Sequence, residues 1–297
     1  MDIRAILMGL AFAVMWSSAF TSARIIVADA PPLMALALRF AISGALAVLI
    51  ALWMGQSWRL TRTQWRATII FGICQNALYL GLNFVAMQRI EASLAAIIAS
   101  SMPLLVGVAG WLFAGQRMSL IGVIGLIAGF CGVVIIMGAR LGAGADLYGI
   151  GLCLIGVLSL TVATLALRNA SSGGNFMMVV GLQMLIGSAV LWPAGLLLET
   201  VEVTLSAKLV LAFIYTTLVP GLAATLVWFW LVNRIGAVKA ATFHFLNPFL
   251  GVAIAALVLS EGLGTMDILG VIIITLGILA VQISRQTGRT ETNSTAK

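Results

Sequence analysis

Long apolar runs, separated by short polar or glycine-rich segments, dominate the hydrophobic pattern of this 297-residue chain. A helix needs roughly 20 mostly apolar residues to cross a bilayer, and ten runs reach about that length. The predicted helices cover 5–27, 33–54, 67–88, 92–114, 119–138, 147–168, 175–197, 207–230, 236–259 and 265–284. The pattern therefore predicts an all-α polytopic membrane protein with ten transmembrane helices.

The same short pattern of residues occurs once in each half of the chain. The first half carries Arg89, Pro103, Gly125 and Gly132, and the second carries Arg234, Pro248, Gly270 and Gly277 at one offset (248 − 103 = 145). A constant offset over this length indicates a duplicated unit. Because each copy crosses the membrane five times, the second copy is upside down relative to the first. We therefore predict two inverted five-helix repeats, 1–138 and 147–284, around a central cavity, followed by a polar cytoplasmic tail, 285–297.

Basic residues predict the orientation, because Lys and Arg are retained on the cytoplasmic side of short loops. Eleven lie on the side of the two termini: Arg4, Arg59, Arg62, Arg66, Arg117, Arg168, Arg234, Lys239, Arg285, Arg289 and Lys297. Four lie on the other side: Arg24, Arg89, Arg140 and Lys208. Both termini are therefore predicted to be cytoplasmic. Arg39 alone lies well inside a predicted helix.

Composition excludes a water-soluble domain, with 62% hydrophobic residues, 8% charged residues and a mean hydropathy of +1.16. The net charge of +7 comes from cations scattered singly between apolar runs, a pattern that favours membrane lipid over nucleic acid as the partner. Cys74, Cys131 and Cys153 lie in apolar stretches without metal-ligand spacing. No metal or other cofactor is predicted.

Polar residues within the predicted spans mark candidate binding positions, because such side chains tend to face the bundle interior or water. Asn76, Tyr79 and Asn83 lie at i, i+3 and i+7 of the third helix, on one face. His244 and Asn247 repeat the first part of this spacing in the ninth helix. We predict that both stripes contact a small-molecule substrate; the alternative is hydrogen bonding between helices.

One tryptophan and three hydroxyl residues extend this set. Trp16 and Ser17 in the first helix, Ser100 in the fourth and Thr164 in the sixth complete the predicted substrate-binding residues. Each hydroxyl could instead bond to its own helix backbone. Pro103, Pro220 and Pro248 interrupt the fourth, eighth and ninth helices and are predicted hinges.

Missing motifs narrow the function. The chain has no Gly-x-x-x-x-Gly-Lys-Ser/Thr phosphate loop, and so any transport is secondary. No Asp or Glu lies inside a predicted span away from its ends, which disfavours ion coupling and favours a facilitative or exchange-like carrier. With no carboxylate pair and no His-Glu-x-x-His motif in the membrane, an enzyme is not predicted. A single deep cation, Arg39, favours neutral or zwitterionic ligands over phosphorylated ones.

A stripe of small residues in the fifth helix predicts close helix packing. Gly122, Gly125, Gly129 and Gly132 lie at i, i+3, i+7 and i+10 and allow a neighbouring backbone to approach. Such stripes serve contacts within one chain and contacts between protomers, and so the sequence leaves monomer and homodimer open.

Several short motifs together resemble the EamA family of the drug/metabolite transporter superfamily, along nearly the whole chain. They are Trp16-Ser17-Ser18-x-Phe20, Leu38-Arg39-Phe40, Tyr79 with Arg89, Ser101-x-Pro103, Gly125 to Gly132 and Ser260-Glu261. The resemblance is closest to the family's amino-acid and metabolite exporters. It implies ten helices in two inverted repeats, with helices one, three, four, six, eight and nine around the cavity.

The resemblance also implies a function, namely export of neutral amino acids, aromatic ones included, and of small hydrophobic metabolites by alternating access across a bacterial inner membrane. Two alternatives stay open: a phosphorylated-metabolite antiporter of the same superfamily and a membrane assembly protein that transports nothing. One departure concerns a paired acid. Where relatives often carry Gly-Glu after the fourth helix, this chain has Gly115-Gln116, although Glu261 keeps the acid in the second copy.

Overall fold

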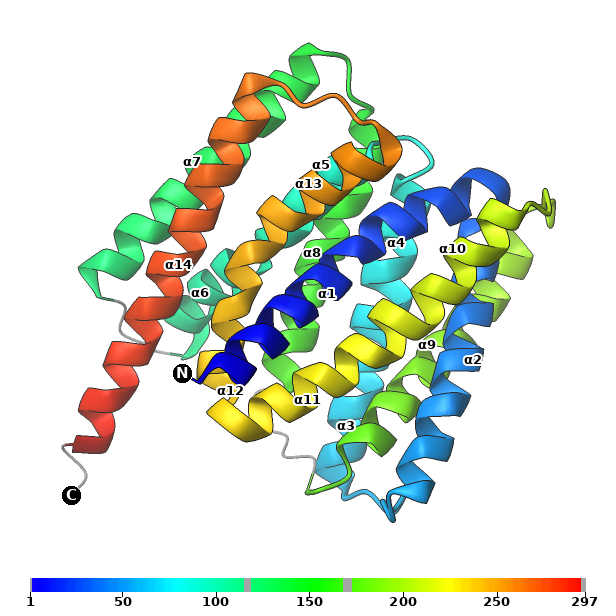
Figure 1. Ribbon diagram of the computed structural model, residues 1–297, viewed down its shortest axis with the longest axis horizontal. Helices are drawn as coiled ribbons and strands as arrows, with labels where there is room; N and C mark the ends of the chain where they lie inside the picture. Colours follow the sequence, from blue (N-terminus) through cyan, green and yellow to red (C-terminus); the bar gives the residue numbers. More distant parts are fainter. Residues whose placement is uncertain (1, 115–118, 168–172, 295–297) are drawn as a thin grey trace.

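The structure, a computed structural model, describes residues 2–114, 119–167 and 173–294, and within them every regular element is a helix (Figure 1). Six crossings are single helices: α1 (Ile3–Asp29), α2 (Pro32–Trp53), α7 (Leu120–Gly142), α8 (Leu147–Leu167), α9 (Phe176–Leu198) and α14 (Thr265–Ser294). These described ranges contain ten helical segments long and apolar enough to cross a membrane, which confirms the predicted fold class. α14 runs past the predicted end of its span, and so the segment predicted as a polar tail begins as helix.

The other four crossings are interrupted. They are α3 (Arg62–Phe71) with η1 (Gly72–Tyr79) and α4 (Leu80–Ala86); α5 (Ala92–Ser100) with α6 (Met102–Ala114); α10 (Ala207–Leu218) with η2 (Val219–Ala223) and α11 (Ala224–Ile235); and α12 (Ala237–Ala241) with η3 (Thr242–Leu246) and α13 (Asn247–Leu259). η1 and η2 are wide π-helical turns at equivalent places in the two copies. The duplication has therefore preserved the irregularities of the helices as well as their number.

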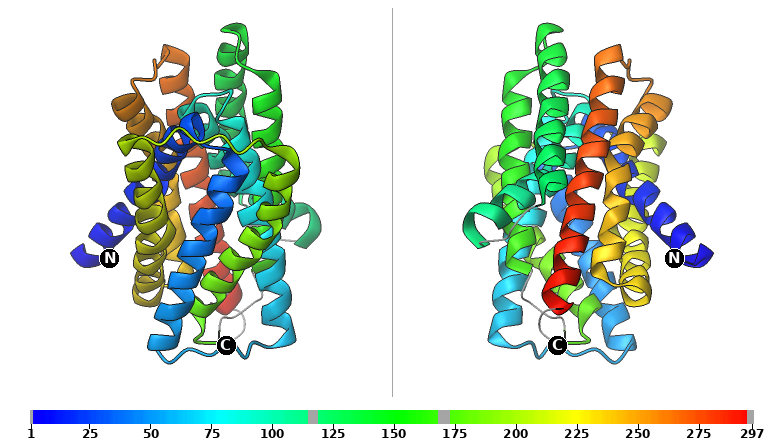
Figure 2. Two further views of the ribbon diagram at one scale, coloured as in Figure 1. Left: turned by 90° about the vertical axis from the view of Figure 1, so that its right-hand side faces the viewer. Right: turned by 90° about the vertical axis from the view of Figure 1, so that its left-hand side faces the viewer.

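The alternating direction of the ten crossings gives the bundle two ends. We call the end that holds residue 2, the 54–61 loop and the 285–294 segment the terminal end. The distal end holds the 87–91, 143–146, 199–206 and 260–264 loops (Figure 2). At the terminal end, Arg234 pairs with Asp2 and holds the pKa of that carboxyl at about 2. Asp2 is therefore ionised throughout the neutral range, and this contact would weaken only as the pH falls towards 2.

Two helix pairs, α7 with α14 and α2 with α9, join the repeats most extensively and lie side by side in Figure 1. In the first pair Gly125 faces Gly277 and Gly132 faces Gly270, in antiparallel order. A Cβ at Gly132 would lie 2.9 Å from the Gly270 carbonyl oxygen. The neighbour of the predicted glycine stripe is therefore the equivalent helix of the same chain.

The second pair carries reciprocal caps at its ends. The Glu199 carboxylate, just after α9, accepts hydrogen bonds of 2.8 and 3.0 Å from the backbone N–H groups of Leu33 and Met34, in the first turn of α2. At the terminal end, Gln56 follows α2 and its Oε1 accepts a 3.0 Å bond from the Met178 N–H near the start of α9. The first backbone N–H groups of a helix have no hydrogen-bond acceptor within that helix. In this pair, a side chain of each copy accepts hydrogen bonds from such N–H groups of the other copy.

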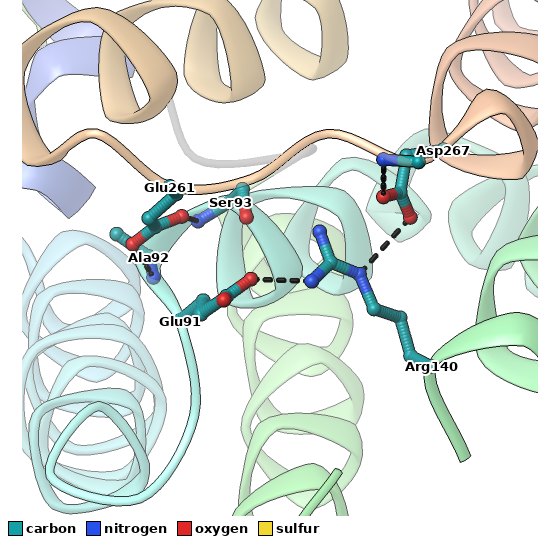
Figure 3. A network of polar contacts seen from close by, with 7 residues as sticks. Glu91, Ala92, Ser93, Arg140, Glu261 and Asp267 are labelled. Atoms are coloured by element: carbon teal, nitrogen blue, oxygen red, sulfur yellow. Dashed lines mark hydrogen bonds and ion pairs between the residues drawn. The ribbon is translucent and has the colours of Figure 1, made fainter. Parts of the chain in front are cut away.

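A polar network ties the repeats together at the distal end (Figure 3). The Glu261 carboxylate accepts bonds of 2.8 and 2.9 Å from the N–H groups of Ala92 and Ser93, which begin α5. Nearby, Arg140 pairs with Glu91 and, at 3.0 Å, with Asp267, a buried acid in the first turn of α14. The equivalent of Glu261 in the first copy is Gln116, which lies outside the described residues, as do the predicted cytoplasmic charges Arg117, Arg168 and Lys297.

Removing the Glu261 cap is expected to destabilise the protein. Glu261→Ala leaves two backbone donors at the start of α5 without their acceptor, at a cost of about 1 to 3 kcal/mol. The apparent melting temperature of the detergent-solubilised protein should fall. Glu202→Ala, which removes an exposed acid at the same end, is the matched control and should leave the melting temperature unchanged. Equal melting temperatures for the two variants would contradict the assigned role of Glu261.

Candidate functional site

One cavity lies between α1, α2, the interrupted third crossing and the kink of the eighth. It holds about 540 Å³ not filled by protein atoms, counting the part open to solvent. Its lining residues are Trp16, Ala19, Phe20, Ala23, Arg39, Gln75, Tyr79, Leu80, Asn83, Phe84, Met87 and Pro220. Eleven of these twelve residues belong to the first copy, and Pro220, the equivalent of Gln75 (220 − 75 = 145), is the one contributed by the second copy.

The cavity extends from mid-depth towards the distal end. Trp16 lies 13 residues from each end of α1 (16 − 3 and 29 − 16), while Ala23 and Met87 are near the distal ends of their helices. At this margin the Arg24 guanidinium donates a hydrogen bond to the Met87 carbonyl oxygen, which links α1 to the end of the third crossing. The walls are mainly apolar and aromatic.

Packed rings close the other side of the cavity, towards the terminal end. Phe12, Trp16, Trp228 and His244 form this aromatic cluster, with ring centroids 4.7 Å apart for Phe12 and Trp228 and 5.1 Å apart for Trp228 and His244. Phe12 is only 2% exposed, and the buried Phe243 and Leu231 continue the packing beyond it. Between Trp16 and the terminal end, α1 is therefore packed against α11 and η3.

The π-helical turn of η1 decides which polar residues of the third crossing face the cavity. A π turn contains more residues than an α turn, and so positions four apart stay on one face. Gln75, Tyr79 and Asn83, which follow that spacing, line the cavity. Asn76 instead turns away, and its Nδ2 donates a 2.9 Å bond to the Gln183 carbonyl oxygen on α9. Of the predicted stripe, two residues reach the cavity and the third links helices.

The other predicted residues, which are Ser17 and those of the fourth, sixth and ninth crossings, are not in the lining of the cavity. The Ser100 and Thr164 hydroxyls donate to carbonyl oxygens of their own helices. Ser17, Asn247 and His244 form a chain, with 3.5 Å between Ser17 Oγ and Asn247 Oδ1 and 2.9 Å between Asn247 Nδ2 and His244 Nδ1. Through His244 this chain joins the aromatic cluster, and so these residues border the closed side of the cavity.

The three predicted hinge prolines all lie at helix irregularities. Pro103 follows the break between α5 and α6, Pro248 follows the 3-10 turn of η3, and Pro220 lies in η2 and lines the cavity. A proline removes one backbone donor and so frees a carbonyl in the preceding turn. Of the three, only Pro220 is among the residues that line the cavity.

Arg39 is the charged residue of the lining, and the sequence analysis did not assign it to the site. It lies on α2, which the resemblance did not place around the cavity, and it is only 5% exposed. Arg39 is the one charged residue deep inside a predicted helix, and this could have assigned it to the site from the sequence. Among the described residues, the fourth, sixth and ninth crossings, which the resemblance placed around the cavity, supply no lining side chain.

These features define a polytopic α-helical membrane protein with an inverted repeat and a cavity to which both copies contribute lining residues, the architecture of a secondary transporter. The sequence profile of the EamA-like transporter family matches residues 3–138 and again residues 147–283. The chain belongs to this family, which confirms the resemblance, and it is a multi-pass membrane transporter.

Individual relatives cover most of the chain. It is similar to the uncharacterized transporter YvbV of Bacillus subtilis, at 29% identity over 90% of this chain and 88% of that protein. It is also similar to protein PagO of Salmonella typhimurium, at 24% identity over 95% of each chain, and to the uncharacterized inner membrane transporter YedA of Escherichia coli, at 24% over 92% and 88%. One solved crystal structure matches with a TM-score of 0.69 over 97% of this chain and 99% of that chain; at 21% identity it shows the fold alone.

Proposed function

We propose that this protein exports neutral amino acids, aromatic ones included, and related small hydrophobic metabolites by alternating access. The observation that carries the proposal is the cavity of the first copy beside the kink at Pro220, walled by Trp16, Phe20, Tyr79 and Phe84. Aromatic walls bury apolar side chains of a ligand, while a few polar groups set its orientation. Two inverted copies can exchange conformations and so open the cavity to either side in turn.

We infer a facilitative or exchange-like mechanism, because no Asp or Glu is among the residues that line the cavity. Membrane carboxylates are the usual proton relays and sodium ligands of coupled carriers. The predicted hinges Pro103, Pro220 and Pro248 would let the ends of the bundle move while the packed pairs α7–α14 and α2–α9 hold the copies together.

We place the protein in a bacterial inner membrane with both termini in the cytoplasm. The excess of Lys and Arg at the terminal end supports this orientation, and one relative is named an inner membrane transporter. The aromatic cluster then closes the cavity towards the cytoplasm, and the described conformation is the one from which a ligand would leave to the outside.

The test is counterflow of labelled phenylalanine and leucine in liposomes that contain the purified protein. We expect saturable exchange, and we expect Tyr79→Ala to slow it roughly five- to tenfold, because an aromatic contact to a ligand contributes about 1 kcal/mol. Tyr148→Ala, which removes an exposed ring on α8, is the matched control and should exchange like the unmodified protein. Absence of flux for every neutral amino acid with folded protein would refute the proposal.

A further inference from the structure

Arg39 is a buried cation for which the described residues provide no counter-ion. The ion pairs in the described part of the chain join Arg89, Arg140 and Arg234 to acids near the ends of the bundle, and none involves Arg39. Burying an unpaired charge costs several kcal/mol, and so a protein keeps one only where something compensates it. Contacts within the protein offset only part of the cost of burying the Arg39 charge.

One N–H of the guanidinium has a structural partner. Arg39 Nε donates a 3.2 Å hydrogen bond to the Thr216 carbonyl oxygen, four residues before Pro220, where the proline supplies no N–H. The Cζ atom also lies 5.1 Å from the centroid of the Phe40 ring, a favourable cation–π distance. These contacts fix the side chain against the kink of the eighth crossing and orient its outer edge.

The outer edge of the guanidinium faces the cavity. Neither terminal nitrogen of Arg39 has a hydrogen-bond partner among the described residues, although the side chain lines the cavity and is almost fully buried. An arginine presents these N–H groups as a planar fork that matches the two oxygens of a carboxylate. The Tyr79 hydroxyl and the Gln75 amide, which also line the cavity, likewise have no side-chain partner in the described part of the chain.

We propose that Arg39 binds the carboxylate of the transported molecule, so that the cavity selects small monocarboxylates with an apolar or aromatic body, α-amino acids among them. This inference rests on the proposed function and names its specificity-determining residue. One guanidinium neutralises one carboxylate, whereas a phosphate ester would leave excess negative charge in an apolar cavity. The equivalent position in the second copy is Met184 (184 − 39 = 145), and so the site holds a single carboxylate on one side.

The test compares ligands that differ at the carboxyl group, in binding and in flux. Phenylalanine and 3-phenylpropionate keep the carboxylate, phenylalaninamide and phenethylamine lack it, and phenyl phosphate replaces it. We expect the first two to compete with labelled phenylalanine at least about tenfold better than the other three, as for loss of a charge-assisted pair. Arg39→Gln should remove this preference and Arg39→Lys should retain part of it, an outcome that a purely structural role for Arg39 would not produce.

Equal competition by phenylalanine and phenylalaninamide, an unchanged preference in Arg39→Gln, or stronger competition by phenyl phosphate would each overturn the inference. If Arg39→Gln does not fold, the comparison of ligands on the unmodified protein still decides, because it needs no substitution. Equal flux of all five compounds would refute the inference while leaving a transporter. Absence of binding and flux for all five with folded protein would refute the proposed amino-acid function, and this inference with it.

Discussion

Gly277→Ala is expected to cause the largest loss of stability of any single methyl addition in the bundle. A Cβ at this position would lie 2.6 Å from the Gly125 carbonyl oxygen and 2.7 Å from the Gly129 backbone nitrogen. Both atoms belong to the backbone of α7, and so no side-chain rotation can relieve the contact. Forcing extra atoms into a well-packed contact costs typically about 1 to 3 kcal/mol, and here α14 must move away from α7 as a whole.

The measurement is the melting temperature and the yield of monodisperse protein in detergent. Gly138→Ala is the matched control, because Gly138 also lies in α7 and a Cβ there would meet no atom within 4 Å. An alanine in an open helical position is favourable by up to about 1 kcal/mol, and so the control should be at least as stable as the unmodified protein. If Gly277→Ala melts with the control, α7 and α14 are not packed as described.

Ala19→Phe is expected to slow transport strongly while the protein stays folded. Ala19 lines the cavity on α1, and a phenyl ring placed there would occupy space that the ligand needs. Counterflow of labelled phenylalanine should be at least about tenfold slower, which corresponds to more than about 1.4 kcal/mol of lost ligand binding. Folding should survive because the added ring fills open space instead of meeting packed backbone.

The control for this substitution is Val14→Phe on the same helix. Val14 is 45% exposed on the surface of the bundle, and so the same ring added there should leave both flux and melting temperature unchanged. Undiminished counterflow in Ala19→Phe would show that the ligand does not pass through this cavity. This pair of variants therefore tests where the transport pathway lies, independently of which residue recognises the substrate.

The candidate site was harder to predict than the fold, and the third crossing shows why. The spacing of Asn76, Tyr79 and Asn83 placed all three on one face of a regular α-helix. The π turn of η1 changes the rotation per residue, so that Gln75 replaces Asn76 in the lining. No proline marks this turn in the sequence; the equivalent proline, Pro220, lies in the other copy. The offset of 145 residues, which aligns Gln75 with Pro220, was the signal in the sequence that could have located this irregularity.

The sequence by itself determined the membrane class, the ten crossings and the inverted duplication, because apolar length and a constant offset are properties of the chain alone. Tertiary structure decided the partner of the glycine stripe and the surroundings of Arg39. A stripe of small residues allows close approach of any helix, and only the packed bundle shows that the neighbour is α14. A charge within an apolar run is costly wherever it lies; only the assembled bundle brought Arg39 to the Thr216 carbonyl and the open cavity.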